Sequence, residues 1–502
     1  MCLHRSAGLP ASYEPRALMR FMSPSGRRLL GCCLAVLGLA ASAHAGAAVQ
    51  ESLSRGEIVE RVLCQKDPDQ SYALYLPSSY IRETPLPILY CFDPGARGSV
   101  PVELFRDAAE GLNYIVVGSN NSRNGPWAPN LAAIRALLED TGSRLALDIR
   151  RVYTAGMSGG GGPAWHVAVA GAAGTIICAS AMDFKEKELR PISLCFFGVA
   201  GVADFNYESV FNHVETLRKL GKTARFETFE AGHSWPPKEV ARTALEWLEL
   251  QAIRCGLRAA DEDFVEKQFR KERTRASEFE SAGRLLEAQR AYESLVRDFD
   301  GLRDVTPCQA NAARLIARKE TREGRKRELD IADRQVLEVR KLLEAKAALE
   351  TPAMGRLKQP DDFRQSVLDA EMELKDSIST LKNKMKKPFP DSERIIAQRV
   401  LDAFYIHMIT NAGELIREKR YAPAIVNYEL CSHIRPGSAG LLFELARAHA
   451  GCQEKGKAIE YLGKAVEAGF RDTEAIRQAV ELQNLRGDER FREIVSRLDA
   501  PH

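Results

Sequence analysis

A serine between glycines is the residue of this sequence with the clearest capacity for chemistry. Ser158 lies in the pentapeptide Gly156-Met157-Ser158-Gly159-Gly160, which has the pattern Gly-x-Ser-x-Gly. A hydroxyl presented on a sharp turn between a strand and a helix can attack an acyl carbon, and small residues are needed there because a Cβ would clash with the neighbouring turn. A glycine-rich structural turn is the alternative interpretation. We predict that Ser158 is a nucleophile.

A nucleophilic serine requires a base to take its proton and a carboxylate to hold that base. His233 lies just after an expected strand and before an expected helix, downstream of the serine, which is the position of the base in the order Ser, Asp or Glu, His. Asp204 follows the preceding strand and is the favoured carboxylate, with Glu208, Glu230 and Asp183 as rivals. A loop-capping role for His233 and a helix N-cap role for Asp204 remain open.

The negatively charged oxygen of an acyl-transfer intermediate needs two N–H donors that point to one place. Gly159, directly after the nucleophile, is predicted to supply one of them. The second is expected from the loop after the strand at 88–92, where Asp93-Pro94 precedes Gly95 and Ala96. Proline has no N–H to donate, so Gly95 or Ala96 is the expected second donor.

Two tryptophans lie on expected loops of the same region. Trp127 follows the expected strand at 114–119, and Trp235 lies two residues after the predicted base. Either ring could form an aromatic wall for a substrate, and ordinary loop packing is the equal alternative. Few residues separate the expected strands at 175–179 and 192–199, so an open site without a lid is predicted.

The region around these residues alternates strand-like and helix-like patterns. Short apolar runs occur at 72–76, 88–92, 114–119, 152–155, 175–179, 192–199 and 224–229. Helical patterns occur between them at 102–112, 130–145, 163–172, 208–220 and 238–250. Continuous apolar strands that alternate with helices indicate an α/β fold, with a mostly parallel sheet covered by helices on both faces.

Residues 72–250 resemble the α/β-hydrolase family, and within it the esterase branch that includes poly(3-hydroxybutyrate) depolymerases and feruloyl or acetylxylan esterases. The resemblance is carried by Arg151-Val152-Tyr153 before the serine motif, by Gly201 to Asp204, and by Gly232-His233-Ser234-Trp235-Pro236. It implies a serine hydrolase that acts on esters and does not fix the substrate. The Asp93-Pro94 pair departs from the usual His-Gly of the family's oxyanion loop.

The C-terminal part of the sequence reads as helices and contains a repeat. Ala424, Ile425 and Tyr428 recur as Ala458, Ile459 and Leu462, each at an offset of 34 residues. This offset is typical of tetratricopeptide repeats, which the region 402–480 resembles, and a further isolated unit is indicated around Gly283 and Tyr292. Generic antiparallel helices are the alternative. Such repeats stack side by side and typically bind peptides or partner proteins on a concave face.

The N-terminal segment has the features of a signal peptide. Arg27 and Arg28 precede an apolar run at 29–39, and Ala43-His44-Ala45 forms a small-x-small cleavage pattern. The predicted organisation is therefore a signal peptide at 1–45, a catalytic α/β domain at 46–254, a charged helical region at 255–390 and helical repeats at 391–502. We expect a periplasmic or extracellular protein with no transmembrane segment once the signal is removed.

Composition narrows the remaining classes of function. The 502 residues are 45% hydrophobic, which excludes wholesale disorder, and the net charge of +3 argues against a nucleic-acid binder. Eleven cysteines without a Cys-x-x-Cys pair indicate neither a disulfide scaffold nor a structural zinc site. We expect a serine esterase that needs no cofactor or metal, takes an ester substrate and binds a protein or peptide partner through its repeats. A non-catalytic scaffold and a serine peptidase are the alternatives.

Overall fold

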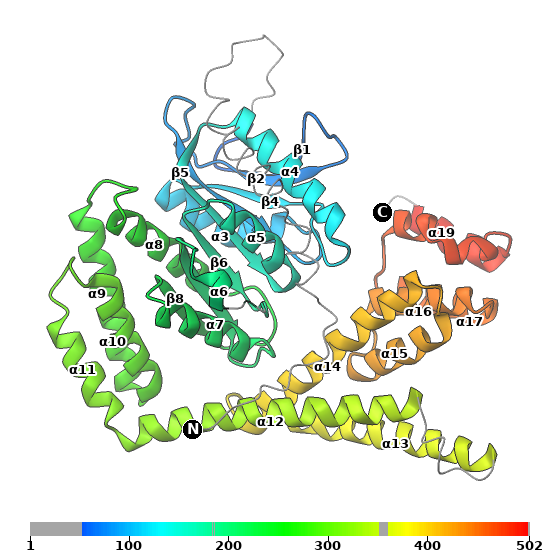
Figure 1. Ribbon diagram of the computed structural model, residues 1–502. Coiled ribbons are helices and arrows are strands. Elements are labelled where there is room, and N and C mark those ends of the chain that lie inside the picture. Colours follow the sequence, from blue (N-terminus) through cyan, green and yellow to red (C-terminus); the bar gives the residue numbers. More distant parts are fainter. Residues whose placement is uncertain (1–52, 183, 185, 351–359, 500–502) are drawn as a thin grey trace. The chain divides into compact units, whose positions relative to one another are not determined.

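The computed structural model describes residues 53–182, 184, 186–350 and 360–499 (Figure 1). The chain divides into two compact units, 1–326 and 327–502. The predicted signal peptide lies outside the described residues. Across the ranges described, no helix combines the length and the apolar character needed to cross a membrane.

Unit 1 is built on one eight-stranded sheet with the strand order β1-β2-β4-β3-β5-β6-β7-β8. From β4 to β8 all neighbouring strands are parallel, whereas β2 is antiparallel to both β1 and β4. The strands are β1 (Ile58–Leu63), β2 (Ser71–Tyr75), β3 (Leu86–Phe92), β4 (Ile115–Ser119), β5 (Leu147–Met157), β6 (Gly174–Cys178), β7 (Cys195–Gly201) and β8 (Ala224–Phe229).

Helices cover both faces of this sheet. Successive side chains of each strand point to opposite faces and contribute to two hydrophobic cores. Along β3, Ile88, Tyr90 and Phe92 enter one core, while Leu89 and Cys91 enter the other. The first core packs against α4 (Trp127–Arg144), α5 (Gly161–Val169) and α7 (Tyr207–Lys219), and the second against α3 (Ser99–Leu112) and α8 (Lys238–Arg254). A short helix, α6 (Glu186–Leu189), lies between β6 and β7.

The predicted α/β fold class is confirmed, including all seven expected strands and the five helices between them. Most strand ends differ from the predicted ends by one to five residues. The sequence analysis did not find β1, because Glu60 and Arg61 interrupt its apolar pattern and half of its residues are exposed. This strand pairs antiparallel with β2 at one edge of the sheet, away from the predicted catalytic residues.

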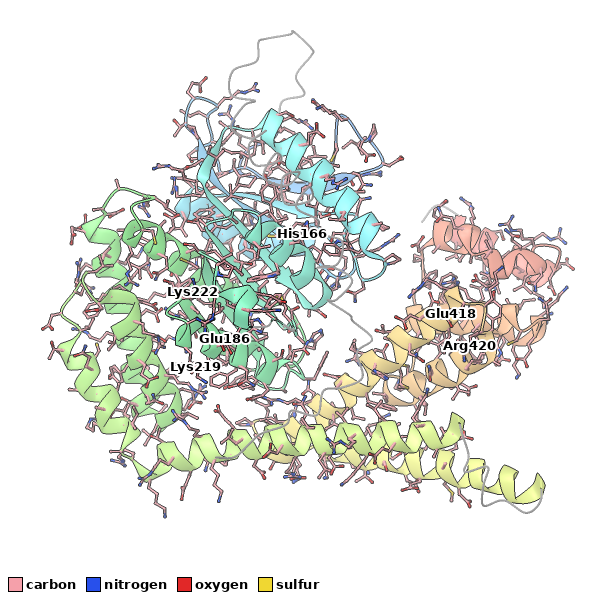
Figure 2. The ribbon with its side chains drawn as sticks, in the orientation of Figure 1. His166, Glu186, Lys219, Lys222, Glu418 and Arg420 are labelled. Carbon is pink, nitrogen blue, oxygen red and sulfur yellow. The ribbon has the colours of Figure 1, made fainter. Side chains whose placement is uncertain are left out.

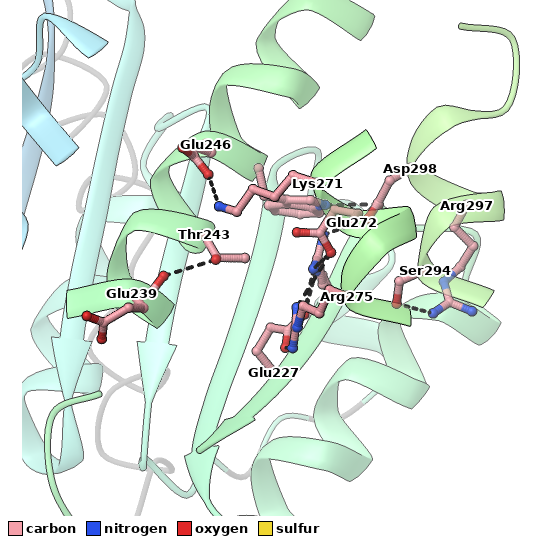
Figure 3. A network of polar contacts seen from close by, with 12 residues as sticks. Glu227, Glu239, Thr243, Glu246, Lys271, Glu272, Arg275, Ser294, Arg297 and Asp298 are labelled. Atoms are coloured by element: carbon pink, nitrogen blue, oxygen red, sulfur yellow. Dashed lines mark hydrogen bonds and ion pairs between the residues drawn. The ribbon is translucent and has the colours of Figure 1, made fainter. Parts of the chain in front are cut away.

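Three further helices belong to unit 1: α9 (Glu262–Ser281), α10 (Leu285–Phe299) and α11 (Thr306–Ile316). The sequence analysis places these residues in a separate region that begins at 255, whereas the compact unit continues to Lys326. The physical reason is a buried cluster of charges that joins β8 and α8 to α9 and α10 (Figure 3). Charged residues at helical spacing ordinarily indicate a solvated face. In α9 and α10, however, Glu272 and Asp298 are buried against the sheet.

Arg225 of β8 is the centre of that cluster. Its guanidinium lies 2.6 Å from Glu227, 2.6 Å from Glu272 of α9 and 3.2 Å from Asp298 of α10. Arg275 of α9 forms a second ion pair with Glu227. The Arg225 side chain and all three carboxylates are less than a tenth exposed. These paired charges link β8 to α9 and α10, and an apolar cluster that includes Leu250 of α8 and Phe269 of α9 adds to the attachment.

Unit 2 is all helical within its described residues. Its helices are the later part of α12 (Lys319–Glu350), then α13 (Pro360–Lys384), α14 (Ser392–Arg417), α15 (Tyr421–Ile434), α16 (Ala439–Gly451), α17 (Lys455–Glu467), α18 (Thr473–Gln478), η3 (Val480–Leu485) and α19 (Glu489–Asp499). The turn between α14 and α15 carries an exposed ion pair between Glu418 and Arg420, both marked in Figure 2. The predicted helical C-terminal region is confirmed.

The residues of the 34-residue offset occupy similar positions in α15 and α17. Ala424 and Ala458 are both fully buried, as are Tyr428 and Leu462. At Gly451, a Cβ would lie 2.4 Å from the Tyr421 ring, so α15 and α16 approach closely at this glycine. These contacts are compatible with stacked helix pairs. The assignment to tetratricopeptide repeats stays a prediction.

Candidate active site

The serine motif forms a tight turn between β5 and α5. Ser158 directly follows β5 and has a φ of 52°, in the left-handed region that is strained for a residue with a side chain. A Cβ on Gly160 would lie 2.0 Å from the carbonyl oxygen of Phe92, and one on Gly156 would lie 2.2 Å from that of Gly160. The flanking glycines are therefore required by close backbone approach, and the turn presents the Ser158 hydroxyl at the carboxyl end of the sheet.

Ser158, His233 and Asp204 come together in the structure. The distance from Ser158 Oγ to His233 Nε2 is 2.8 Å. His233 Nδ1 lies 3.2 Å from each carboxylate oxygen of Asp204. With the proton on Nδ1 donated to Asp204, Nε2 is free to accept the serine proton, which is the arrangement of a catalytic triad. Unit 1 has the α/β-hydrolase fold.

Asp204 is completely buried and is held by backbone contacts on its own loop. Its Oδ1 accepts a hydrogen bond of 2.7 Å from the N–H of Asn206. The loop is fixed to the His233 loop, because the Ala203 N–H donates to the Ala231 carbonyl over 2.9 Å. The Phe205 ring packs on the His233 imidazole with 4.5 Å between centroids. These contacts fix the orientation of the base, and the sequence analysis identified neither Phe205 nor Asn206.

The rival carboxylates lie elsewhere. Glu208 is in the first turn of α7, where it accepts a hydrogen bond from Asn212. Glu230 is mostly exposed and lies 3.7 Å from the guanidinium of Arg284. Asp183 lies outside the described residues. Of the described carboxylates weighed from the sequence, Asp204 is the one that lies beside His233.

Asp93 of the predicted oxyanion loop is buried and joins two loops of the site. Its Oδ1 accepts hydrogen bonds from the Gly95 N–H over 2.8 Å and from Arg97 Nε over 2.9 Å. Its Oδ2 accepts from Arg97 Nη2 over 3.0 Å and from the Trp235 indole over 2.8 Å. The loop after β3 is thereby tied to the loop that carries the base.

Asp93 accepts hydrogen bonds from both N–H groups that the sequence analysis assigned to the oxyanion. Gly95 N–H donates to the side chain of Asp93, and Ala96 N–H donates to its backbone carbonyl over 3.2 Å. Neither donor is available in this conformation to an oxygen bound at Ser158. Ala96 has a φ of 58°, so the loop is a tight turn closed on Asp93. Gly159 stays the predicted first donor.

Asn124, on the loop after β4, occupies the space next to Gly159. A Cβ built on Gly159 would lie 1.6 Å from Asn124 Oδ1 and 3.4 Å from its Nδ2. Any side chain at position 159 would displace this amide. The sequence analysis assigns no role to Asn124, and the signal that could have found it is a glycine directly after the nucleophile.

The two tryptophans have packing roles in the structure. Trp235 donates its indole N–H to Asp93, as described above. Trp127 begins α4 and meets the edge of the His166 ring of α5, marked in Figure 2, with 5.3 Å between centroids. Both tryptophans are partly exposed. Their role as a wall for substrate stays a prediction.

Comparisons with known proteins give similarity in structure only. No protein-family model matches the sequence, and no curated protein matches it. Among solved structures, the chain is similar to a thermophilic esterase of Thermogutta terrifontis with bound butyrate (15% identity, 40% of this chain and 96% of the other covered, TM-score 0.32). S-formylglutathione hydrolase FrmB of Staphylococcus aureus (14% identity, 40% and 99%, 0.33) and a ferulic acid esterase (18% identity, 38% and 94%, 0.32) are also similar. At these identities no substrate can be carried over to this chain.

Proposed function

We propose that this protein is a serine hydrolase that cleaves carboxylic esters through an acyl-enzyme intermediate. The proposal rests on a chain of two contacts: His233 Nε2 lies 2.8 Å from Ser158 Oγ, and His233 Nδ1 lies 3.2 Å from the Asp204 carboxylate. Ser158 itself lies on a strained turn. A purely structural glycine-rich turn does not require a base at hydrogen-bonding distance from its serine, nor a buried carboxylate behind that base.

The reaction proceeds in two halves that use the same proton carrier. Ser158 Oγ bonds to the ester carbonyl carbon while its proton passes to His233 Nε2, and the carbonyl electron pair moves onto oxygen. The intermediate collapses, the bond to the alkoxy oxygen breaks, and His233 returns its proton to the departing alcohol. Water then attacks the acyl carbon in the same way, which releases a carboxylic acid and restores the Ser158 hydroxyl. Asp204 stabilises the imidazolium in both halves.

Esters are favoured over amides because the segment between β6 and β7 is short, which fits a site open to bulk water. Between β6 and β7, the place where a lid is inserted in larger members of the fold, the described residues form one short helix, α6. The base is 11% exposed, so water can reach it. An open site of this kind suits soluble esters or exposed chain ends. The identity of the acid and the alcohol is left to a substrate panel.

An active-site phosphonate probe tests the proposal on the purified full-length chain. We expect one equivalent of label on Ser158, hydrolysis of p-nitrophenyl esters, and loss of both in Ser158→Ala, with kcat lower by at least about 10⁴-fold. Ser143→Ala, a surface serine at the end of α4, serves as the control and should behave as wild type. Wild-type protein that neither labels nor hydrolyses short-chain esters would contradict the proposal.

The helices outside the sheet are proposed to bind a protein or peptide partner. Support comes from a hollow of about 470 Å³ between α9, α10 and α11, which is the position of the isolated repeat-like unit. Its lining is mixed and includes Arg273, Glu278, Tyr292 and Asn311. Co-purification of one protein with the full chain, and its loss after Tyr292→Ala, would support this part of the proposal.

A further inference from the structure

The second oxyanion donor is missing from the loop that should supply it. An ester carbonyl attacked by Ser158 develops a full negative charge on oxygen, and one backbone N–H, from Gly159, stabilises it incompletely. The two backbone N–H groups of the β3 loop are already donated to Asp93. Asp93 also accepts hydrogen bonds from Arg97 and Trp235, so a loop movement that freed the two N–H groups would disturb these contacts of a buried carboxylate as well.

We propose that the side-chain amide of Asn124 supplies this second donor, an inference that rests on the proposed esterase function. The amide oxygen lies 1.6 Å and the amide nitrogen 3.4 Å from the point where a Cβ of Gly159 would be, and a half-turn about the Cβ–Cγ bond of Asn124 exchanges the two atoms. That point is beside the backbone N–H of the residue after the nucleophile, so the amide and this N–H can reach one oxygen. Among the described residues, the Asn124 side chain has no hydrogen-bond partner, and its Nδ2 donors are available to a ligand.

The backbone of Asn124 is held in place on both sides. Its N–H donates to the Pro94 carbonyl over 2.9 Å, and the preceding Arg123 forms an antiparallel bridge with Gly95. Buried Asn130 of α4 then fixes the loop: its Oδ1 accepts from the Arg123 N–H over 2.9 Å and its Nδ2 donates to the Arg123 carbonyl over 3.0 Å. A donor positioned before substrate arrives costs little reorganisation when charge develops.

Gly159 is explained by the same arrangement. The residue has a partly exposed α-carbon in a strained turn, and nothing in the turn itself demands glycine there. The amide of Asn124 demands it, because any Cβ would lie 1.6 Å from Oδ1. A glycine after the nucleophile and an asparagine after β4 thus form one functional pair.

The inference is tested by steady-state kinetics with p-nitrophenyl butyrate on the full-length protein. We expect Asn124→Ala to lower kcat by about 10²- to 10³-fold with KM changed less than about threefold, because the donor acts on the transition state. Asn124→Asp, which keeps the size and removes both N–H donors, should lose at least as much. Asn121→Ala is the matched control: that amide lies on the same loop but bonds Ser71 and Asp69.

A transition-state analogue separates this role from a structural one. The affinity of a trifluoromethyl ketone, which forms the same oxyanion on Ser158, should fall in Asn124→Ala in proportion to kcat/KM, while the affinity for the product carboxylate stays within about threefold. An Asn124→Ala enzyme with near wild-type kcat and analogue affinity would overturn the inference and leave the esterase proposal intact. A wild-type protein that fails to label at Ser158 would overturn both.

Discussion

Removal of the Arg225 side chain is expected to destabilise unit 1 more than any loss of a surface charge. Arg225 is 3% exposed and is the nearest cation to Glu272 and Asp298. In Arg225→Met, Glu227 keeps Arg275, but Glu272 keeps only a contact of 3.5 Å to Arg275, and Asp298 keeps the Trp247 indole N–H at 2.9 Å. Breaking a buried ion pair on one side costs about 3–5 kcal/mol, because the remaining charge is left without compensation.

The matched control is Lys271→Met on α9, the helix that also carries Glu272. Lys271 pairs with Glu246, also shown in Figure 3, but its side chain is 39% exposed. Exposed pairs contribute about 0–1 kcal/mol. The expected difference between the two variants is therefore about 2–5 kcal/mol, which corresponds to a Tm lower by roughly 4–20 °C for a unit of this size.

Urea unfolding followed by tryptophan fluorescence measures this difference for unit 1 alone. The four tryptophans of the sequence are Trp127, Trp165, Trp235 and Trp247, all of which lie before the division at Lys326. Equal midpoints for Arg225→Met and Lys271→Met would refute the reasoning and would mean that α9 and α10 are held to the sheet by apolar contacts alone. A lower midpoint in Arg225→Met with an unchanged slope would support it.

The pH dependence provides a second check on the same variant. Burial raises the pKa of Asp298, so the folded state takes up a proton at a higher pH than the unfolded state does. A carboxyl whose folded pKa is raised reduces stability as the pH rises, and removing Arg225 strengthens this effect. The destabilisation of Arg225→Met should therefore be smaller at pH 5 than at pH 7. A destabilisation that is constant across this range would contradict the assignment.

Two further predictions concern single side chains. Trp235→Phe keeps the ring but removes the indole N–H that Asp93 accepts, so we expect a loss of about 1.5–3 kcal/mol in stability and a lower kcat, measured by urea unfolding and ester hydrolysis; an unchanged enzyme would show that this joint does not position the base. The hydrogen bond with Cys195 lowers the pKa of exposed Cys255 to about 6, so its alkylation by iodoacetamide should be close to maximal at pH 7. In Cys195→Ala the rate at pH 7 should fall at least about tenfold, and an equal rate would disprove the contact.

The proximity of Ser158, Asp204 and His233 could be predicted from the sequence because it depends on local pattern and on order along the chain. Ser158 directly follows β5, Asp204 and His233 lie on the loops that follow β7 and β8, and parallel strands bring their carboxyl ends to one edge of the sheet. The apolar runs that define these strands are continuous, so their existence is visible without any tertiary information. The Gly-x-Ser-x-Gly pattern is weak by itself and becomes informative because a continuous apolar strand directly precedes it.

The oxyanion loop could not be predicted because its geometry depends on distant partners. Asp93 is bound by Trp235, which lies 142 residues away, and this contact decides what the Gly95 N–H does. Asn124 reaches Gly159 only because its loop is bridged to Gly95. The attachment of α9 and α10 to the sheet also depends on distant partners, since pairing of Arg225 with Glu272 and Asp298 buries residues whose charge alone indicates exposure.

The departure of Asp93-Pro94 from the usual loop sequence and the presence of Asn124 are best understood together. A carboxylate that ties Arg97 and Trp235 to the loop after β3 gives the base loop a rigid support, but it consumes the N–H groups that would otherwise bind the oxyanion. If the protein is the proposed hydrolase, another donor must reach the same oxygen for the enzyme to stay active. Asn124 has that position, and Gly159 has the small size that leaves room for it. The double variant Asn124→Ala with Gly159→Ala should consequently lose little more activity than Asn124→Ala alone, because the space that the second change fills is already vacant.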